Sequence, residues 1–141
     1  MNLRRNLDFI EKVSVESVAA HYKDRFDFVV ANGRAVQLAQ AWSFQLPNQD
    51  DLVRDLKAWA WTVRGVRDSG GKVETNERRI DVPRDVDVAA IFIPPLEGAA
   101  SEALDVAEAL CHDAGVRLVP LADVVAAVVR PALDKLGMLT R

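Results

Sequence analysis

The chain has 141 residues, of which 50% are hydrophobic, 28% charged and 6% aromatic, and its formal net charge is -3 at pH 7. That length and apolar fraction fit one globular domain over residues 1–141 and exclude a chain that is mainly disordered. The acidic balance argues against wholesale electrostatic binding to nucleic acid. The single cysteine, Cys111, excludes a disulfide framework within the chain and a cysteine-based zinc site.

Neither end of the chain carries a segment typical of export or of a membrane span. Residues 1–6 lack a continuous apolar stretch, and the apolar run 124–129 is far too short to cross a bilayer. Arginine outnumbers lysine by 13 to 5, a bias typical of a GC-rich bacterial coding sequence. We therefore expect a bacterial, cytoplasmic protein without membrane association.

Hydrophobic periodicity divides the chain into helices and strands. The spacing predicts, in chain order, a helix over 2–22, strands over 25–31 and 35–46, a helix over 49–68, a short strand over 79–82, a strand over 86–93, a helix over 98–114, a strand over 116–121 and a last helix over 123–136. A hairpin followed by alternating helices and strands implies a mixed sheet whose later strands are parallel. The predicted fold class is α/β, a single mixed-sheet domain that begins with a helix and a β-hairpin.

The hairpin is marked by Asn32-Gly33, the strongest short hairpin signal in the chain. Both central residues of a type I′ turn need a positive φ, which asparagine and glycine tolerate best. A two-residue turn pairs Ala31 with Arg34, and this pairing sets the register of both strands.

That register brings an acid and an amide together on a mostly apolar face. Asp27 is expected opposite Leu38 and diagonal to Gln40, and Trp42 follows on the same side. The other side of the second strand carries small residues, which leave room for a packing helix. Buried polar groups need partners or a function, so Asp27 and Gln40 are the first candidates for a site.

This arrangement resembles the core of the PD-(D/E)XK nuclease-like fold, in which an Asp on one strand and a Glu-x-Lys on its partner face the same side. The resemblance covers roughly residues 8–121, with Asp27 at the acid position, Gln40 at the Glu position and Trp42 at the Lys position. In that family the acids hold a divalent metal and the lysine orients the attacking water. Glutamine is a poorer ligand for a hard cation than a carboxylate, and tryptophan cannot replace an ammonium group.

The resemblance therefore implies a catalytically degenerate, non-enzymatic binding or assembly module with no metal and no cofactor. By analogy with the family, such domains occur in mobile-element, defence and toxin–antitoxin proteins.

Three alternatives stay open. A metal-dependent nuclease would recruit Glu16 from the first helix as a second acid and Lys57 from the long helix as a base, beside Asp27 and Gln40. A small-ligand domain would place its site at residues 94–98, where the carboxyl end of a strand meets a helix. An unrelated α/β domain would use Asp27 for a local hydrogen bond.

The helix over 49–68 carries the candidate partner surface. Trp59 lies on its apolar stripe and is predicted to be core, whereas Trp61 lies off that stripe, on a second packing surface. We expect a protein partner or self-association there. The helix also carries a basic row, Lys57, Arg64 and Arg67, whose second interpretation is contact with a nucleic-acid backbone. The predicted partner-binding residues are Trp61, Arg54, Lys57, Arg64 and Arg67.

Overall fold

The computed structural model describes residues 7–45, 47–96 and 101–124 of the chain. These residues form one domain with a mixed sheet of seven strands in the order β5-β4-β1-β2-β3-β6-β7. The α/β class and the mixed sheet are therefore confirmed. The elements are β1 (Asp8–Ser17), β2 (Lys23–Ala31), β3 (Ala35–Ser43), α1 (Gln49–Ser69), β4 (Gly71–Glu74), β5 (Arg79–Val82), β6 (Asp87–Ile93), α2 (Glu102–Ala114), β7 (Arg117–Pro120) and a short 3-10 turn (Leu121–Asp123).

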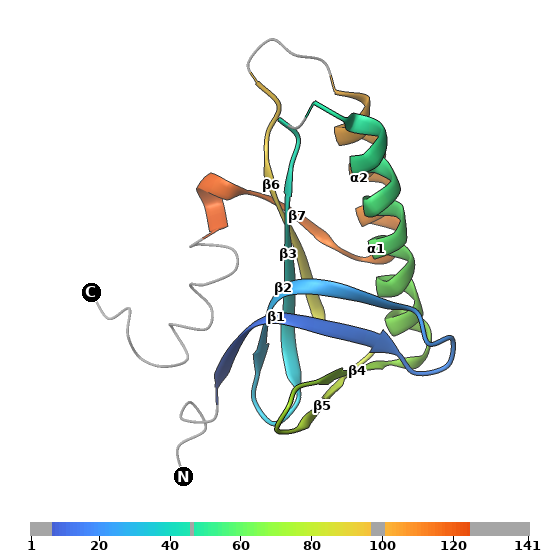
Figure 1. Cartoon of the computed structure of the whole chain (residues 1–141), viewed down its shortest axis with the longest axis vertical. Coiled ribbons are helices and arrows are strands. Elements are labelled where there is room, and N and C mark those ends of the chain that lie inside the picture. Colours follow the sequence, from blue (N-terminus) through green and yellow to red (C-terminus); the bar gives the residue numbers. More distant parts are fainter. Residues whose placement is uncertain (1–6, 46, 97–100, 125–141) are drawn as a thin grey trace, which may run out of the picture.

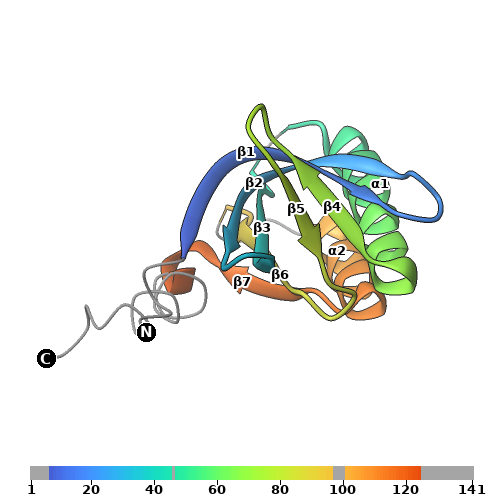
Figure 2. The ribbon, with the colours of Figure 1, turned by 90° about the horizontal axis from the view of Figure 1, so that it is seen from below.

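The sheet has an antiparallel half and a parallel half. In Figure 1 the strands β1 and β2 run across the view and β3 and β6 run along it, and Figure 2 shows the sheet curling between them. β1 pairs antiparallel with both β2 and β4, and β5 extends that half as an edge strand. β3, β6 and β7 are parallel, with α1 and α2 in the connections between them. Both helices lie together on one side of the sheet (Figure 1), and parallel strands need such crossover connections.

Residues 8–17 form the strand β1, so the predicted helix over 2–22 was wrong within its described part. In β1 the buried residues Val13, Val15 and Ser17 alternate with more exposed ones, which is the two-residue period of a strand. Pairing with β2 on one edge and β4 on the other satisfies the backbone, and β-branched valines suit that environment. Tertiary pairing therefore decides the structure of a segment whose apolar spacing alone fits a helix.

The β2–β3 hairpin is present, but its turn is one residue longer than predicted. Ala31 pairs with Ala35 rather than with Arg34, which leaves residues 32–34 in the turn. Gly33 has a φ of 80°, the left-handed conformation that glycine adopts without strain. The Asn32 N–H donates to the Arg34 carbonyl at 2.8 Å and closes the turn.

The longer turn and an irregularity in β2 together move the register of the hairpin by two residues from the prediction. Val29 lies opposite Leu38, and the register shifts between Val30 and Ala31. The ladder ends at the pair Phe28–Ala39, so Asp27 has no ladder partner on β3, and the predicted pairing of Asp27 with Leu38 was wrong. Val29 and Leu38 keep their predicted face. Phe26 does not, because it packs with Val29 in the core beside the helices, whereas Phe28 packs with Ala39 in a separate cluster.

α1 keeps its predicted range but packs on the other face of β3 from the one expected. The Asn48 side chain accepts a hydrogen bond of 3.1 Å from the Asp51 N–H and caps the first turn. Both helices contribute to the core on the face of β3 that carries Leu38 and Trp42. The larger side chains on this face offer more apolar area to bury than the small residues on the other.

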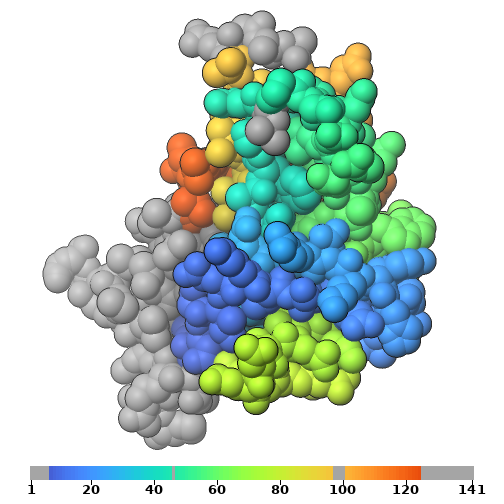
Figure 3. Space-filling view, viewed as in Figure 1, coloured from blue at the N-terminus to red at the C-terminus, as the bar shows by residue number. Residues whose placement is uncertain are grey.

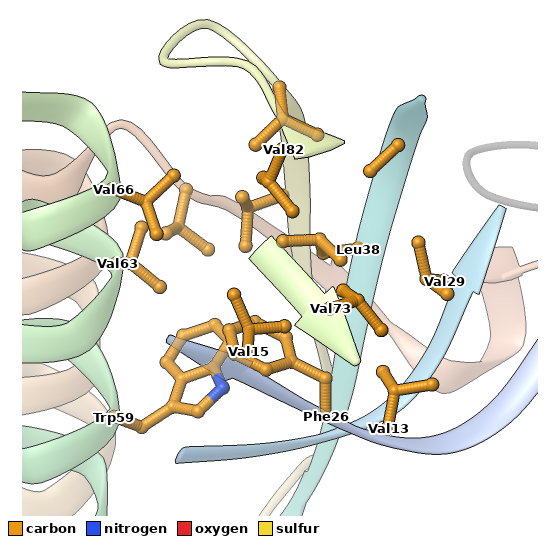
Figure 4. Close-up of a cluster of buried hydrophobic side chains, with 14 of the residues drawn as sticks. Val13, Val15, Phe26, Val29, Leu38, Trp59, Val63, Val66, Val73 and Val82 are labelled. Carbon is orange, nitrogen blue, oxygen red and sulfur yellow. The ribbon is translucent and has the colours of Figure 1, made fainter. Parts of the chain in front are cut away.

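Trp59 anchors α1 to the sheet. It is 1% exposed, and its ring centroid lies 5.3 Å from that of Phe26 and 5.6 Å from that of Trp42. Figure 4 shows Trp59 and Phe26 side by side between the helix and the strands. The prediction that Trp59 is core is confirmed.

The later elements follow the sequence closely, although β4 was not predicted. Ser101 caps α2 by accepting a hydrogen bond of 3.1 Å from the Leu104 N–H. The predicted last helix over 123–136 falls almost entirely on residues outside the described ones, as does part of the ligand loop 94–98. Within the described ranges, neither helix combines the length and the apolar character needed to cross a membrane.

Candidate functional site

Asp27, the acid expected from the sequence, lies where β2 parts from β3, beside the β3 residues that follow Gln40. The ladder between these strands ends at the pair Phe28–Ala39, although both strands continue. There the Asp27 carboxylate accepts a hydrogen bond of 2.6 Å from the Ala41 backbone N–H. The ladder provides no carbonyl on β2 for the Ala41 N–H. The Asp27 carboxylate supplies the acceptor that this backbone N–H needs. We call this region, with Gln40 and Trp42, the Asp27 corner.

The other two positions of the corner are neutral side chains turned into the protein. Gln40 is half-buried, and its Oε1 has no hydrogen-bond partner among the described residues. Trp42 packs edge-on against Trp59, and both indole Nε1 atoms are likewise unpaired within the described ranges. The corner therefore presents one engaged carboxylate, one amide and two apolar rings, whereas hard divalent cations prefer several charged oxygen ligands.

Glu16 and Lys57, which would complete a nuclease, are not brought to Asp27. Glu16 lies on β1 opposite Lys23, and its carboxylate is 3.1 Å from Nδ1 of His21. At strand spacing this is about 13 Å along the sheet from the level of Asp27. Lys57 is exposed on α1. In the part of the chain that the structure describes, no three His, Cys, Asp or Glu residues are grouped to hold a metal ion.

Arg67, one of the predicted partner-binding residues, holds the chain's own backbone. Its guanidinium donates hydrogen bonds to four carbonyl oxygens, from the C-terminal end of α2 and from the segment before β6. These bonds join the last turn of α1 to two elements that follow it in sequence. Arg67 is therefore committed to the fold and does not belong to the exposed basic row. The four carbonyls are those of Ala114, Gly115, Arg84 and Val86.

The second candidate site is a cavity of about 150 Å³ between the β1–β2 turn and α1. The turn lies beside the C-terminal half of the helix (Figures 1 and 3). Tyr22 and Trp61 are 39% and 52% exposed, and their ring centroids are 5.6 Å apart at an interplanar angle of 58°. The Arg64 guanidinium lies over the Trp61 ring, 5.7 Å from its centroid. We call this the Trp61 cavity; it is lined by Ala19, Ala20, Tyr22, Trp61, Arg64, Gly65, Asp68 and Ser69.

Small residues allow the turn to approach the helix this closely. A Cβ at Gly65 would lie 2.9 Å from Cβ and Oγ of Ser17 and 3.2 Å from Cδ2 of Tyr22. The Ser69 hydroxyl accepts a hydrogen bond of 3.0 Å from the Ala19 N–H and donates one of 3.2 Å to the Gly65 carbonyl. The fold itself therefore holds Tyr22 beside Trp61.

The remaining partner candidates lie along the exposed side of α1. Arg54 is neutralised by Asp51 at 3.2 Å and Asp55 at 3.5 Å. Lys57 and Arg64 are exposed, and neither has an ion pair with another described residue. Of the predicted partner residues, Lys57 and Arg64 thus remain near Trp61 on the helix as cations unpaired within the described ranges. Arg54, neutralised two turns before Trp61, and Arg67, bound to the backbone, do not belong to this surface.

Sequence reasoning missed Tyr22, Asp68 and Ser69 as parts of this cavity. Tyr22 was missed because its segment was assigned to a helix instead of a strand and a tight turn. The available signal was Gly65, because a glycine inside a helix costs about 1 kcal/mol relative to alanine and so indicates a close approach.

In comparisons with known proteins, the chain matches no family model, no curated protein and no solved structure at a significant level.

Proposed function

We propose that the chain is a non-enzymatic protein-binding module whose partner docks at the Trp61 cavity. The observation that carries this proposal is the exposure of Trp61 and Tyr22 around a cavity that the fold already holds open. Tryptophan, tyrosine and arginine are the residues most enriched in binding hot spots. Trp61, Tyr22 and Arg64 supply all three at one place.

The resemblance to a catalytically degenerate nuclease-like domain is part of the same proposal. The Asp27 carboxylate is engaged by a backbone N–H, Gln40 is neutral and Trp42 packs against Trp59. Metal-assisted hydrolysis needs charged ligands for the metal and a group that positions the attacking water. By the same resemblance, we propose a role in a mobile-element, defence or toxin–antitoxin system.

A displayed library of random peptides, selected on the immobilised chain, tests the proposal. Peptides enriched on the wild type are expected to lose binding to Trp61→Ala. They should keep binding to Arg54→Ala, a matched control on the same side of the same helix. Circular dichroism confirms that both variants remain folded.

Two results contradict the proposal. One is a library in which no peptide is enriched, or in which the enriched peptides bind Trp61→Ala as well as the wild type. The other is metal-dependent cleavage of DNA or RNA that disappears in a folded Asp27→Ala variant, which favours the nuclease alternative instead.

A further inference from the structure

Resting on the proposed function, we infer that the docking segment of the partner is an acidic peptide with one apolar anchor. The anchor side chain enters the Trp61 cavity, and carboxylates on either side of it meet Lys57 and Arg64. The inference names the chemistry of the partner, which the proposed function leaves open.

The charges that flank Trp61 carry the inference. Lys57 lies four residues before Trp61 and Arg64 three residues after it, and such positions are neighbours on one helix face, about 5–6 Å apart at Cβ. Within the described ranges both cations are exposed and without an ion pair. One turn earlier, the charge of Arg54 is already neutralised by two aspartates. The unpaired positive charge is thus confined to the two sides of the tryptophan.

Arg64 is arranged to receive a carboxylate. Its guanidinium lies over the indole of Trp61 at 5.7 Å. A guanidinium can bind a carboxylate with two parallel hydrogen bonds, and that of Arg64 has no ion pair with another described residue. Trp61 therefore serves both as a wall of the cavity and as a support for Arg64.

The dimensions of the cavity set the size of the anchor. A volume of about 150 Å³ is roughly that of five water molecules in the liquid, which is room for one side chain. The walls include Ala19, Ala20 and the two aromatic rings, so an apolar side chain is favoured. Asp68, at the end of the cavity away from Lys57, can accept a backbone N–H of the bound peptide.

The same surface disfavours two other occupants. A nucleic-acid backbone would carry its phosphates past Asp51, Asp55 and Asp68, which border the basic row on the same helix. A second copy in a two-fold contact would bring Lys57 and Arg64 against their own equivalents. An acidic peptide avoids the second repulsion, and it limits the first because its carboxylates lie only beside Lys57 and Arg64.

Fluorescence anisotropy with three labelled probes tests the inference on the full chain. The probes are a peptide with one tryptophan flanked by glutamates, the same peptide with glutamines in their place, and an oligothymidylate. The glutamate peptide is expected to bind about fivefold more tightly than the glutamine peptide, as two exposed ion pairs allow, and the difference should shrink at high salt.

Variants assign the effect to the named residues. Arg64→Gln should remove most of the preference for glutamate, and Trp61→Ala should remove binding of both peptides. Arg54→Gln, the matched control, should leave both affinities unchanged. Circular dichroism and thermal unfolding are recorded for each variant, so that a folding defect is recognised.

Three outcomes overturn the inference. They are equal affinity for the glutamate and glutamine peptides, tighter binding of the oligothymidylate at the same surface, and a dimer in sedimentation that Trp61→Ala dissociates. The first leaves the proposed function standing, because the tryptophan is still bound at Trp61. Failure of the proposed function itself is recognised separately, as library peptides whose binding does not depend on Trp61.

Discussion

The Asp27 corner and the Trp61 cavity use similar residue types for different ends. At the corner, the Asp27 carboxylate accepts a hydrogen bond from a backbone N–H, and Trp42 packs edge-on against Trp59 inside the protein. At the cavity, a tryptophan and a tyrosine face solvent, and the nearby cations have no described acidic partner. Residue type therefore does not locate a binding site by itself. What separates the two regions is exposure. At the corner Gln40, Trp42 and Trp59 turn into the protein, whereas at the cavity Tyr22 and Trp61 face solvent.

The largest expected effect is a difference in stability between substitutions of two nearby tryptophans, Trp59 and Trp61. Trp59→Ala should lower the free energy of unfolding by about 3–5 kcal/mol, because it removes a 1% exposed side chain from the core. Trp61→Ala should change it by less than about 1 kcal/mol, as surface substitutions do. Urea unfolding followed by circular dichroism measures both. Equal losses for the two variants would return Trp61 to the core.

Arg67 tests whether a charge on the long helix serves the fold. Arg67→Met should cost about 2–3 kcal/mol, because four carbonyl oxygens lose a charged donor in a half-buried setting. Arg54→Met is the control and should cost less than about 0.5 kcal/mol, since its ion pairs are exposed. Thermal unfolding of the two variants, compared with the wild type, reports the difference. A stable Arg67→Met variant would return Arg67 to the candidates for partner binding.

Asp27 tests the structural role of the corner. Asp27→Ala should cost about 0.5–1 kcal/mol, because the Ala41 N–H loses its acceptor at an exposed position. Asp27→Asn should cost less, since an amide oxygen can accept the same hydrogen bond. Chemical unfolding at neutral pH distinguishes the two. Identical stability of wild type and Asp27→Ala would show that the hydrogen bond contributes nothing to the fold.

The smallest expected effect concerns Asp87, another acid that the chain satisfies. Burial raises the pKa of Asp87, but hydrogen bonds from Arg117 and Gln37 outweigh it, so that the pKa lies below its usual value. The ionised carboxylate therefore stabilises the fold above about pH 4, and this contribution is lost as the pH falls through the lowered folded pKa.

Asp87→Asn should accordingly be less stable than the wild type at pH 7, by less than about 1 kcal/mol because the pair is partly exposed. The gap should close as the pH falls below about 4. Thermal unfolding across the pH range measures it. A difference in stability between Asp87→Asn and the wild type that stays constant down to pH 2.5 would contradict the lowered pKa of Asp87.

The sequence supports the parallel half of the fold better than the antiparallel half. The range of α1 follows from the spacing of Leu52, Leu56 and Trp59, and β6 follows from a continuous apolar run. β1 could not be predicted in the same way, because Val13 and Val15 become strand residues only by pairing with β2 and β4. Asn32-Gly33 located the hairpin, but neither the extra turn residue nor the irregularity between Val30 and Ala31 could be predicted from it. Each shifts the register by one residue.

The candidate sites show the same limit. Trp61, Lys57 and Arg64 could be selected from helical spacing alone, since they lie within two turns of one helix. Tyr22 could not, because it reaches Trp61 only through the β1–β2 turn. Arg67 was assigned to the partner surface because the carbonyls that it binds come from segments distant in sequence.

The indole N–H resonances give the most direct test of the central claim, that binding occurs at Trp61 and not at the Asp27 corner. The chain has three tryptophans, and each gives its own indole cross-peak in a two-dimensional ¹H–¹⁵N spectrum of the labelled protein. Titration with the unlabelled glutamate-flanked tryptophan peptide should shift the Trp61 cross-peak and leave those of Trp42 and Trp59 in place. Shifts confined to Trp42 and Trp59, with Trp61 unmoved, would contradict the account.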